Sequence, residues 1–252
     1  MLVIAHLSDL HLDGTETRRR KAVRVKEYLD KLTRPVDVIL LSGDIVDDGT
    51  EAGYAAVAEL FDGPAPVLAL PGNHDLRGPL SASMLEGRGT VPGKPLHWAE
   101  TVRGVLFVLL DTTVPGEDGG RLDADGIAWL EGTLADAAPG TPVLLVMHHP
   151  PVVLGHPFVD SIRLADSDGL AATVRAHPEI VALLAGHAHT AAAATFAGVP
   201  LLVAPGVSST MLLPWEPNPG THPVLDLDAP PGFAYHQLDD ENRLTTHFRL
   251  LP

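Results

Sequence analysis

Aspartate, asparagine and histidine side chains recur along this chain in short clusters, each directly after an apolar run. The clusters are Asp9-Leu10-His11, Gly43-Asp44, Gly72-Asn73-His74-Asp75, His148-His149 and Gly186-His187-Ala188-His189. Turn chemistry accounts for Gly72 and Asn73, but not for His74 and Asp75. Because imidazole, carboxylate and amide groups are all metal ligands, the clusters indicate a metal centre.

The number of candidate ligands exceeds what one four-coordinate ion can use. Asp9 and His11 are two residues apart, as are His187 and His189, and this spacing places each pair on one side of an extended chain. If Asp44 is shared, two ions each receive four protein groups. The candidate ligands are Asp9, His11, Asp44, Asn73, His148, His187 and His189. This mixture of nitrogen and hard oxygen suits manganese, iron, zinc or cobalt better than calcium or magnesium.

The elements that must position these residues alternate along the first three quarters of the chain. Near-continuous apolar runs predict strands buried on both faces, at Leu2–Leu7, Val36–Leu41, Pro66–Leu70, Val105–Leu110, Pro142–Met147 and Ile180–Ala185. Helical patterns lie between several of them, at Thr15–Leu32, Glu51–Phe61, Asp123–Ala137 and Ser167–Ala176. This order predicts a parallel sheet of the α/β class. Ligands of such sheets bind at the carboxyl ends of the strands, so we expect all the clusters to face one crevice.

The last quarter of the chain has a different pattern. Strands without intervening helices are predicted at Ala192–Phe196, Pro200–Ala204, Phe233–Leu238 and Leu244–Leu250. They suggest an antiparallel portion or a second sheet. The proline-rich segment at about 208–231 predicts a long irregular loop, of the kind that often forms a lid or a contact surface. We expect residues 1–252 to form one domain.

Composition limits the classes of partner. The chain has 252 residues, of which 45% are hydrophobic, lacks cysteine and carries a net charge of −15. Disulfides and thiolate sites are therefore impossible, and a nucleic-acid polymer is not an expected partner. Such a protein also repels small phosphates at long range. Two divalent ions contribute four positive charges, more than Asp9, Asp44 and one hydroxide cancel, and make the centre locally positive.

Targeting and membrane signals are not evident. The segment MLVIAHLSDLH has neither a basic start nor a small-residue cleavage site. Residues 180–215 lack charged side chains, but glycines, histidines and prolines interrupt them. A membrane helix needs about 20 continuous apolar residues. We therefore expect a soluble, cytoplasmic protein without a membrane span.

Taken together, the five clusters resemble the motifs of the calcineurin-like metallophosphoesterase superfamily, in order and at plausible intervals. The resemblance implies a four-layer fold, with two mixed sheets in a sandwich flanked by helices. It implies one metal on Asp9, His11, Asp44 and His189, and a second on Asp44, Asn73, His148 and His187. It further implies that Asn73 and His74 contact the substrate, that His74 assists the leaving group, and that Asp75 orients His74. These residue types in any one cluster could merely cap strand ends, but five clusters together favour the metal centre.

A narrower resemblance is to bacterial cyclic-nucleotide phosphodiesterases and to their glycerophosphodiesterase relatives, and it weakens at Met211–Asp228. It implies hydrolysis of a small phosphodiester, such as cyclic AMP, by a hydroxide held between the metals. The alternatives are a glycerophosphodiesterase, a phosphomonoesterase or protein phosphatase, and a non-catalytic scaffold. A scaffold would be expected to lose ligands, and here none is missing. A homodimer, with the loop at Met211–Trp215 on the partner, is a further expectation.

Several other residues are open to more than one interpretation. His149 is a structural neighbour of His148 or a substrate contact, and for Asp75 a role in a turn or a helix cap competes evenly with the orientation of His74. His156 and His222 lie in loops that could reach the crevice. Arg18-Arg19-Arg20 is expected to be a solvated helix face, and Arg77 a substrate contact only at low odds.

Overall fold

In the first sheet, the N-terminal strand lies between a strand from the first fifth of the chain and a strand from near its C-terminus. The computed structural model describes residues 1–85, 88, 91 and 93–252. Within them, the sheet has the order β15-β14-β1-β2-β3. The strands are β1 (Leu2–Leu7), β2 (Val38–Leu41), β3 (Val67–Ala69), β14 (Gly232–Leu238) and β15 (Leu244–Leu250). β1, β2 and β3 run parallel, whereas β14 pairs antiparallel with β1 and β15, so the sheet is mixed.

The second sheet is also mixed and has the order β10-β11-β9-β7-β5-β4. Its strands are β4 (Trp98–Val102), β5 (Val105–Leu110), β7 (Val143–Met147), β9 (Ile180–Ala185), β10 (Ala192–Phe196) and β11 (Val199–Val203). β5, β7, β9 and β11 are parallel, and the two edge strands are antiparallel to their neighbours. Two small ribbons lie outside these sheets: β6 (Gly120–Arg121) with β8 (Leu164–Ala165), and β12 (Thr210–Met211) with β13 (Leu225–Asp226).

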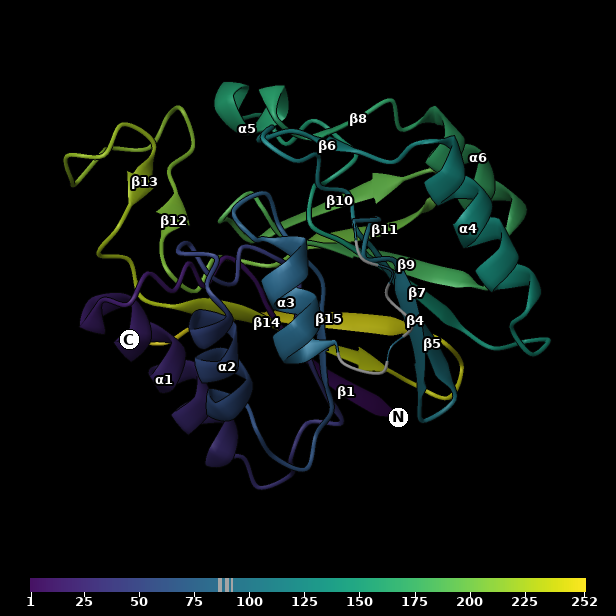
Figure 1. Ribbon diagram of the computed structural model, residues 1–252, viewed down its shortest axis with the longest axis horizontal. Helices are drawn as coiled ribbons and strands as arrows, with labels where there is room; N and C mark the ends of the chain where they lie inside the picture. The colour runs from purple at the N-terminus through teal and green to yellow at the C-terminus, as the bar shows by residue number, and fades with distance from the viewer. Residues whose placement is uncertain (86–87, 89–90, 92) are drawn as a thin grey trace.

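Helices cover the outer faces of the two sheets, which gives four layers (Figure 1). α1 (Glu16–Asp30), α2 (Glu51–Leu60) and α3 (Arg77–Met84) lie beside the first sheet. α4 (Ala124–Ala135) and α6 (Asp168–Ala176) lie beside the second, and the short α5 (Pro157–Ser161) stands beyond its edge. The predicted sandwich of two mixed sheets flanked by helices is confirmed.

Strand alternation produces two apolar clusters. In β5, Phe107 and Leu109 join the cluster that contains β1, β2, α1 and α2, whereas Leu106, Val108 and Leu110 join the one that contains α4 and α6. Successive side chains of a strand point to opposite faces, so the second sheet is buried on both sides.

Most predicted elements lie within two residues of their expected bounds, and Asp123 caps α4 by accepting from the amide of Gly126. Helix α1 buries Ala22, Val25 and Leu29, and Tyr28 and Leu32 pack against the same apolar cluster. The proline-rich segment is not wholly irregular, because it contains β12 and β13. The assignment of residues 1–252 to one domain stays a prediction.

Among the described residues, no helix combines the length and the apolar character that a membrane crossing requires.

Candidate metal centre

The clustered polar residues meet at the carboxyl ends of the parallel strands. Asp9 and His11 follow β1, Asp44 follows β2, and Asn73 follows β3, all in the first sheet. His148 follows β7, and His187 and His189 follow β9, both in the second sheet. A crevice of about 550 Å³ is lined by His11, Asp44, Asn73, His74, His187 and His189 among others. Asp9 and His148 are fully buried and do not line it, so the expectation that every cluster faces one crevice holds only in part.

Asp44 lies between two groups of potential ligands. Its Oδ2 is 3.5 Å from His11 Nε2, and its Oδ1 is 3.4 Å from His148 Nε2. On the first side, ligand atoms of Asp9, His11, Asp44 and His189 lie within 4.8 Å of one another, and all four residues are buried. On the second side, His187 Nδ1 lies 3.2 Å from His148 Nε2. One carboxylate thus presents one oxygen to each group.

Unpaired buried atoms in the centre fit two metal ions. Both carboxylate oxygens of Asp9, the Oδ1 of Asn73 and the Nε2 of His187 are buried and have no hydrogen-bond partner among the residues that the structure describes. Such groups are costly to bury unless something compensates them. The unpaired oxygens of Asp9 and Asn73 are the ligand chemistry that cations would satisfy, whereas His187 faces His148 through Nδ1 rather than through its unpaired Nε2.

The tautomers of two histidines fit the same role. His148 Nδ1 donates to the carbonyl oxygen of Ser42 at 2.7 Å, and His11 Nδ1 donates to Asp47 Oδ1 at 2.6 Å. A neutral ring with its proton on Nδ1 has a lone pair on Nε2. His11 Nε2 faces His189 Nε2 at 3.0 Å, and His148 Nε2 faces His187 Nδ1 at 3.2 Å, so both atoms lie beside other candidate ligands. Hydrogen bonds of this kind fix ligand orientation in metal sites.

The backbone does not have the conformation that the spacing of the ligand pairs suggested. Asp9, His11, Asp44, His187 and His189 have φ angles of 56°, 48°, 50°, 68° and 49°. They lie in the left-handed region rather than in an extended strand, so the same-side argument for the Asp-x-His and His-x-His pairs was wrong. The side chains converge because each strand ends in a tight turn, and non-glycine residues are strained there.

Two glycines permit the close approach of the segments. A Cβ on Gly43 would collide with the His148 ring, and a Cβ on Gly72 would collide with the Asp44 backbone and carboxylate. Gly43 also has a φ of 100°. These positions accept glycine alone.

His74 and His11 share one carboxylate, that of Asp47. His74 Nδ1 lies 3.0 Å from Asp47 Oδ1, and the His74 side chain is about half exposed at the crevice. This hydrogen bond, together with the charges of Asp44 and Asp47, raises the pKa of His74 to about 9 despite partial burial. Burial alone would raise the pKa of Asp47, but its hydrogen bonds to the two histidines hold it well below the usual range.

Asp75 does not orient His74, and this prediction needs correction. Its buried carboxylate accepts from the amides of Ile45 and Val46 at 3.1 Å, from the amide of Gly72 at 2.8 Å and from the Tyr54 hydroxyl at 3.0 Å. It therefore ties the turn after β2 to the turn after β3. Burial, and then the charge of Asp44, raises the pKa of Asp75 to about 6. Asp47 is the residue beside the His74 ring.

His149 is not placed to contact a substrate. It is fully buried, its Nε2 donates to the carbonyl oxygen of Asp118 at 3.1 Å, and its Nδ1 accepts from the Thr112 hydroxyl at 2.8 Å. Burial, and then the charge of His148, lowers its pKa to about 3. The interpretation as a structural neighbour of His148 fits these contacts.

The residues left open by the sequence divide between the crevice and the scaffold. His222 and Arg18 line the crevice, so Arg18 is not simply part of a solvated face. His156 is buried and caps α5, accepting from the amide of Val159. Arg77 pairs with the buried Asp111 at 2.7 Å and does not line the crevice.

Asp47, Ser42 and Ser209 support the centre and were missed by sequence reasoning. Ser209 Oγ lies 2.8 Å from His189 Nδ1, opposite the Nε2 that faces the centre. The only sequence signal for Asp47 was its position three residues after Asp44, where it begins the acidic pair Asp47-Asp48.

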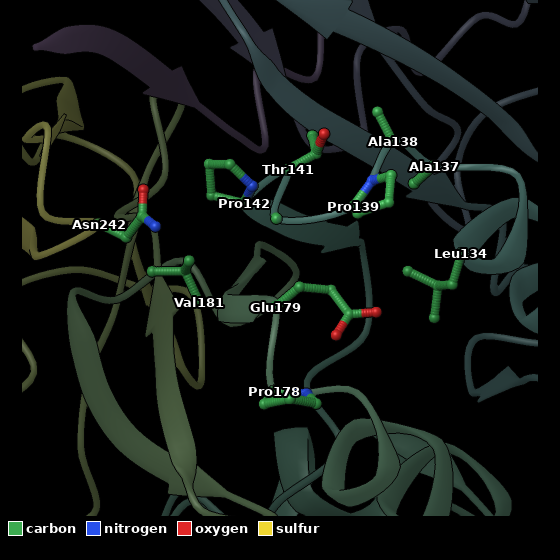
Figure 2. Close-up of a pocket in the computed structure, with 11 residues that line it drawn as sticks. Leu134, Ala137, Ala138, Pro139, Thr141, Pro142, Pro178, Glu179, Val181 and Asn242 are labelled. Atoms are coloured by element: carbon green, nitrogen blue, oxygen red, sulfur yellow. The ribbon is translucent and has the colours of Figure 1, made fainter.

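A larger hollow of about 640 Å³ lies elsewhere, near the amino ends of β7 and β9. Figure 2 shows Glu179 among the prolines and alanines that line it. Glu179 is the single ionisable group among the described lining residues, and it pairs with His177 at 2.8 Å. Because the described residues of this hollow include no group of metal ligands or of acid and base side chains, the hollow is a weaker candidate for catalysis than the crevice.

Comparison with known proteins agrees with this geometry. The sequence model of the calcineurin-like phosphoesterase family matches residues 2–191. A cAMP/cGMP dual specificity phosphodiesterase from Mycobacterium tuberculosis is 35% identical over 80% of this chain and 66% of its own length. A 3′,5′-cyclic adenosine monophosphate phosphodiesterase from Escherichia coli is 32% identical over 98% of this chain and 89% of its own.

A more distant relative and a solved structure complete the comparison. A probable glycerophosphodiester phosphodiesterase from Arcobacter nitrofigilis is 26% identical over 98% of this chain and 92% of its own length. The crystal structure of a dimetal phosphatase from Danio rerio superposes with a TM-score of 0.72, at 17% identity, over 99% of this chain and 96% of that one. The solved structure supports the fold.

Proposed function

We propose, given that this chain belongs to the calcineurin-like phosphoesterase family, that it hydrolyses 3′,5′-cyclic nucleotides at the crevice. The family and the named relatives identify a metal-dependent phosphoric diester hydrolase. The observation that carries the proposal is Asp44, which offers one oxygen to each of two groups of candidate ligands. Each group includes buried atoms that have no hydrogen-bond partner among the described residues.

The chain's residues fit two metal ions, and we propose how they divide. Asp9, His11, Asp44 and His189 would hold one ion, and Asp44, Asn73, His148 and His187 the other. When bound, such ions act as Lewis acids on a phosphate and lower the pKa of water to about 7. We propose manganese, iron, zinc or cobalt, because imidazole and hard oxygen ligands are mixed.

His74 is the proposed proton donor to the leaving oxygen. Asp47 holds its Nδ1, and the raised pKa of about 9 keeps the imidazole protonated at neutral pH. A positioned general acid typically contributes ~10²–10⁴ in rate. Asp47 is then a positioning residue, since it acts on the substrate only through His74 and His11. Asp75 has no direct part, because its carboxylate is occupied by the turns around it.

The alternative is a glycerophosphodiesterase, which the relative from Arcobacter nitrofigilis supports. A phosphomonoesterase or protein phosphatase is less favoured. Arg18 is the one lysine or arginine among the described residues that line the crevice, which suits a singly charged diester better than a dianionic monoester. A non-catalytic scaffold is disfavoured, because every ligand position carries a ligating side chain.

The net charge and one exposed side chain support proposals about the location of the protein and about its partners. We propose a cytoplasmic protein that does not bind a nucleic-acid polymer, because of its net charge of −15. For the homodimer, Met211 is buried and unable to reach a partner, whereas Trp215 is 74% exposed and could do so.

The proposed function is tested by comparing substrates with the protein loaded with Mn²⁺. We expect turnover of cyclic AMP and of bis(p-nitrophenyl) phosphate above that of p-nitrophenyl phosphate, and two metals per chain by elemental analysis. A preference for p-nitrophenyl phosphate would contradict the diesterase, and a glycerophosphodiester turned over in place of cyclic AMP would favour the alternative.

A further inference from the structure

The crevice has two chemically different sides. We call the part of its lining that carries the candidate metal ligands the floor, and the apolar part of its lining the wall. The wall is formed by Phe158 and Ile162 from α5 and its end, and by Met211, Val224 and Leu225 from β12, β13 and the residue before β13. Figure 1 shows α5 and the β12–β13 ribbon projecting beyond the edge of the sheets. A phosphate needs only the floor, so the wall faces another part of the substrate.

The wall is built into the fold rather than loosely attached to it. Val159 of α5 and Met211 of β12 are buried in one apolar cluster, and Val224 and Leu225 pack against it. On the α5 side, the Asp160 carboxylate accepts from the amides of Leu154 and Gly155 and closes the preceding turn.

A lysine anchors the other half of the wall. Lys21 of α1 donates from Nζ to the carbonyl oxygens of Ser208 and Leu227 at 2.7 Å and of Ala229 at 2.8 Å. It therefore holds both ends of the segment that carries β12 and β13. A wall that is held in place before binding loses less entropy when a ligand binds.

The rim beside the wall presents hydrogen-bond donors. His222 Nδ1 accepts from the amides of Val224 at 3.3 Å and Leu225 at 3.0 Å. Its neutral ring must therefore carry its proton on Nε2, as a donor. Arg18, 4.0 Å from Asp13, offers a guanidinium at the same crevice.

We propose that the apolar wall binds the planar base of a nucleotide substrate, with Phe158 against a face of the base and His222 donating to its edge. This inference rests on the proposed function and concerns the same site. Phe158 is 50% exposed and so leaves an aromatic surface available to a ligand. A crevice of about 550 Å³ is within the ~300–1,000 Å³ range of ligand pockets.

The chemistry of the wall favours a base over glycerol. An aromatic base has apolar faces that stack on an aromatic side chain and a polar edge that accepts hydrogen bonds. The hydroxyl groups of glycerol would lose water against this wall without gaining matching partners, and that is unfavourable. The wall thus separates the two substrate classes that the metal centre alone accepts equally.

The test compares two competitive inhibitors, adenosine 5′-monophosphate and glycerol 3-phosphate, on the Mn²⁺-loaded full chain. Wild type, Phe158→Ala and Phe158→Leu are assayed with bis(p-nitrophenyl) phosphate as reporter, and KM for cyclic AMP is measured in parallel. Trp215→Ala is the matched control, because it removes an exposed aromatic side chain that does not line the crevice, from the proline-rich segment that carries β12 and β13.

We expect Phe158→Ala to weaken inhibition by adenosine 5′-monophosphate about tenfold, a typical loss for removal of a stacking aromatic. Inhibition by glycerol 3-phosphate should change less than about twofold, Phe158→Leu should lie between, and Trp215→Ala should match wild type. Equal losses for both inhibitors, or no loss for either, would overturn the inference even if cyclic AMP is hydrolysed.

The two failures are distinguishable. If cyclic AMP is not hydrolysed at all while a glycerophosphodiester is, the proposed function fails, and the inhibitor ratio still reports on the wall. If His222→Ala leaves the inhibition constant of adenosine 5′-monophosphate unchanged, the donor role of His222 is wrong and only the stacking surface remains.

Discussion

Single residues of the centre act through their neighbours as much as through their own chemistry. Asp47 shows this best, because one carboxylate oxygen serves His11 at 2.6 Å and His74 at 3.0 Å. A candidate metal ligand and the candidate acid are therefore coupled through a residue that touches neither metal nor substrate in our proposal.

Asp47→Asn is expected to lower kcat about 10–100-fold, as loss of an orienting partner commonly does. The amide removes a negative charge that raises the pKa of His74, so that pKa falls. Since an acid is active only while protonated, the loss of activity with rising pH should begin at lower pH. Asp48→Asn, at the neighbouring position, is the control, and unchanged pH profiles in both variants would remove Asp47 from the mechanism.

His74→Ala should separate metal binding from turnover. The ring lies at the crevice but is not among the proposed ligands, so metal content should stay at two ions per chain. Turnover should fall by ~10²–10⁴. Elemental analysis and steady-state kinetics on the same preparation check this, and normal turnover would exclude His74 as the acid.

At the scale of elements, the centre depends on how two turns are joined. The Tyr54 hydroxyl of α2 donates to Asp75 at 3.0 Å and accepts from the amide of Leu76 at 2.9 Å. Asp75 in turn holds the amides of Ile45, Val46 and Gly72. A helix thereby fixes the relative position of the segments that carry Asp44 and Asn73.

Tyr54→Phe should destabilise the protein by about 1–3 kcal/mol, because it leaves the Leu76 amide and the Asp75 carboxylate short of a buried partner. Tyr235→Phe is the matched control. The Tyr235 hydroxyl is buried and finds no hydrogen-bond partner within the described part of the chain, so its removal should be neutral or stabilising. Urea unfolding of the three proteins measures both changes, and equal free energies of unfolding for the two variants would contradict the role of Tyr54.

The sequence predicted elements in proportion to how strongly their own residues specify them. Continuous apolar runs such as Leu2–Leu7 and Val105–Leu110 were placed to the residue. α3 and α5 were missed because their order comes from tertiary contacts: α3 buries only Leu80 of its own residues, and α5 spans Pro157–Ser161 alone. β4 was missed because Trp98 is the one fully buried residue in it and the strand therefore has no continuous apolar run.

The residues of the candidate centre likewise divide into those that the sequence could identify and those that it could not. Candidate ligands such as Asp9 and His189 are recognisable by residue type and by their place in the five clusters. The place of Asp47 beside His74, and of Asp75 away from it, depends on turn geometry that the residue types do not encode. Left-handed backbone at the ligands was likewise outside what the two-residue spacing could show.

At the scale of the whole molecule, two buried histidines link acidity to stability. His6 Nδ1 and His236 Nε2 are 3.0 Å apart between β1 and β14, and both side chains are fully buried. Burial lowers the pKa of His236 to about 3. Burial, and then the charge of His236, lowers the pKa of His6 well below its usual value.

Stability should therefore fall as the pH drops below about 6.5, where these histidines take up protons in the unfolded chain but not in the folded one. Each contributes a slope of about 1.4 kcal/mol per pH unit, extending for His236 down to a pH of about 3. In metal-free protein, His236→Gln should show a shallower fall between pH 6 and 4 by chemical denaturation. Identical slopes for wild type and variant would show that His236 is not held neutral.

The left-handed backbone at the ligands has a consequence for the protein's evolution. Glycine adopts a φ of 48° freely, whereas other residues there cost ~1–2 kcal/mol. In metal-free protein, the free energy of unfolding of His11→Gly should thus be about 1 kcal/mol higher than that of His11→Ala. The same pair at Arg24, an exposed position within α1, should rank in the opposite order by a similar amount.

If the two pairs rank alike, the turns at the strand ends are not strained. If the two pairs differ as expected, the residues that the proposed catalysis needs at these positions lower the stability of the metal-free protein. Selection for stability alone, in the absence of metal, would then replace the residues of the proposed centre first. Only selection for the proposed reaction would keep aspartate and histidine at positions where glycine costs less free energy.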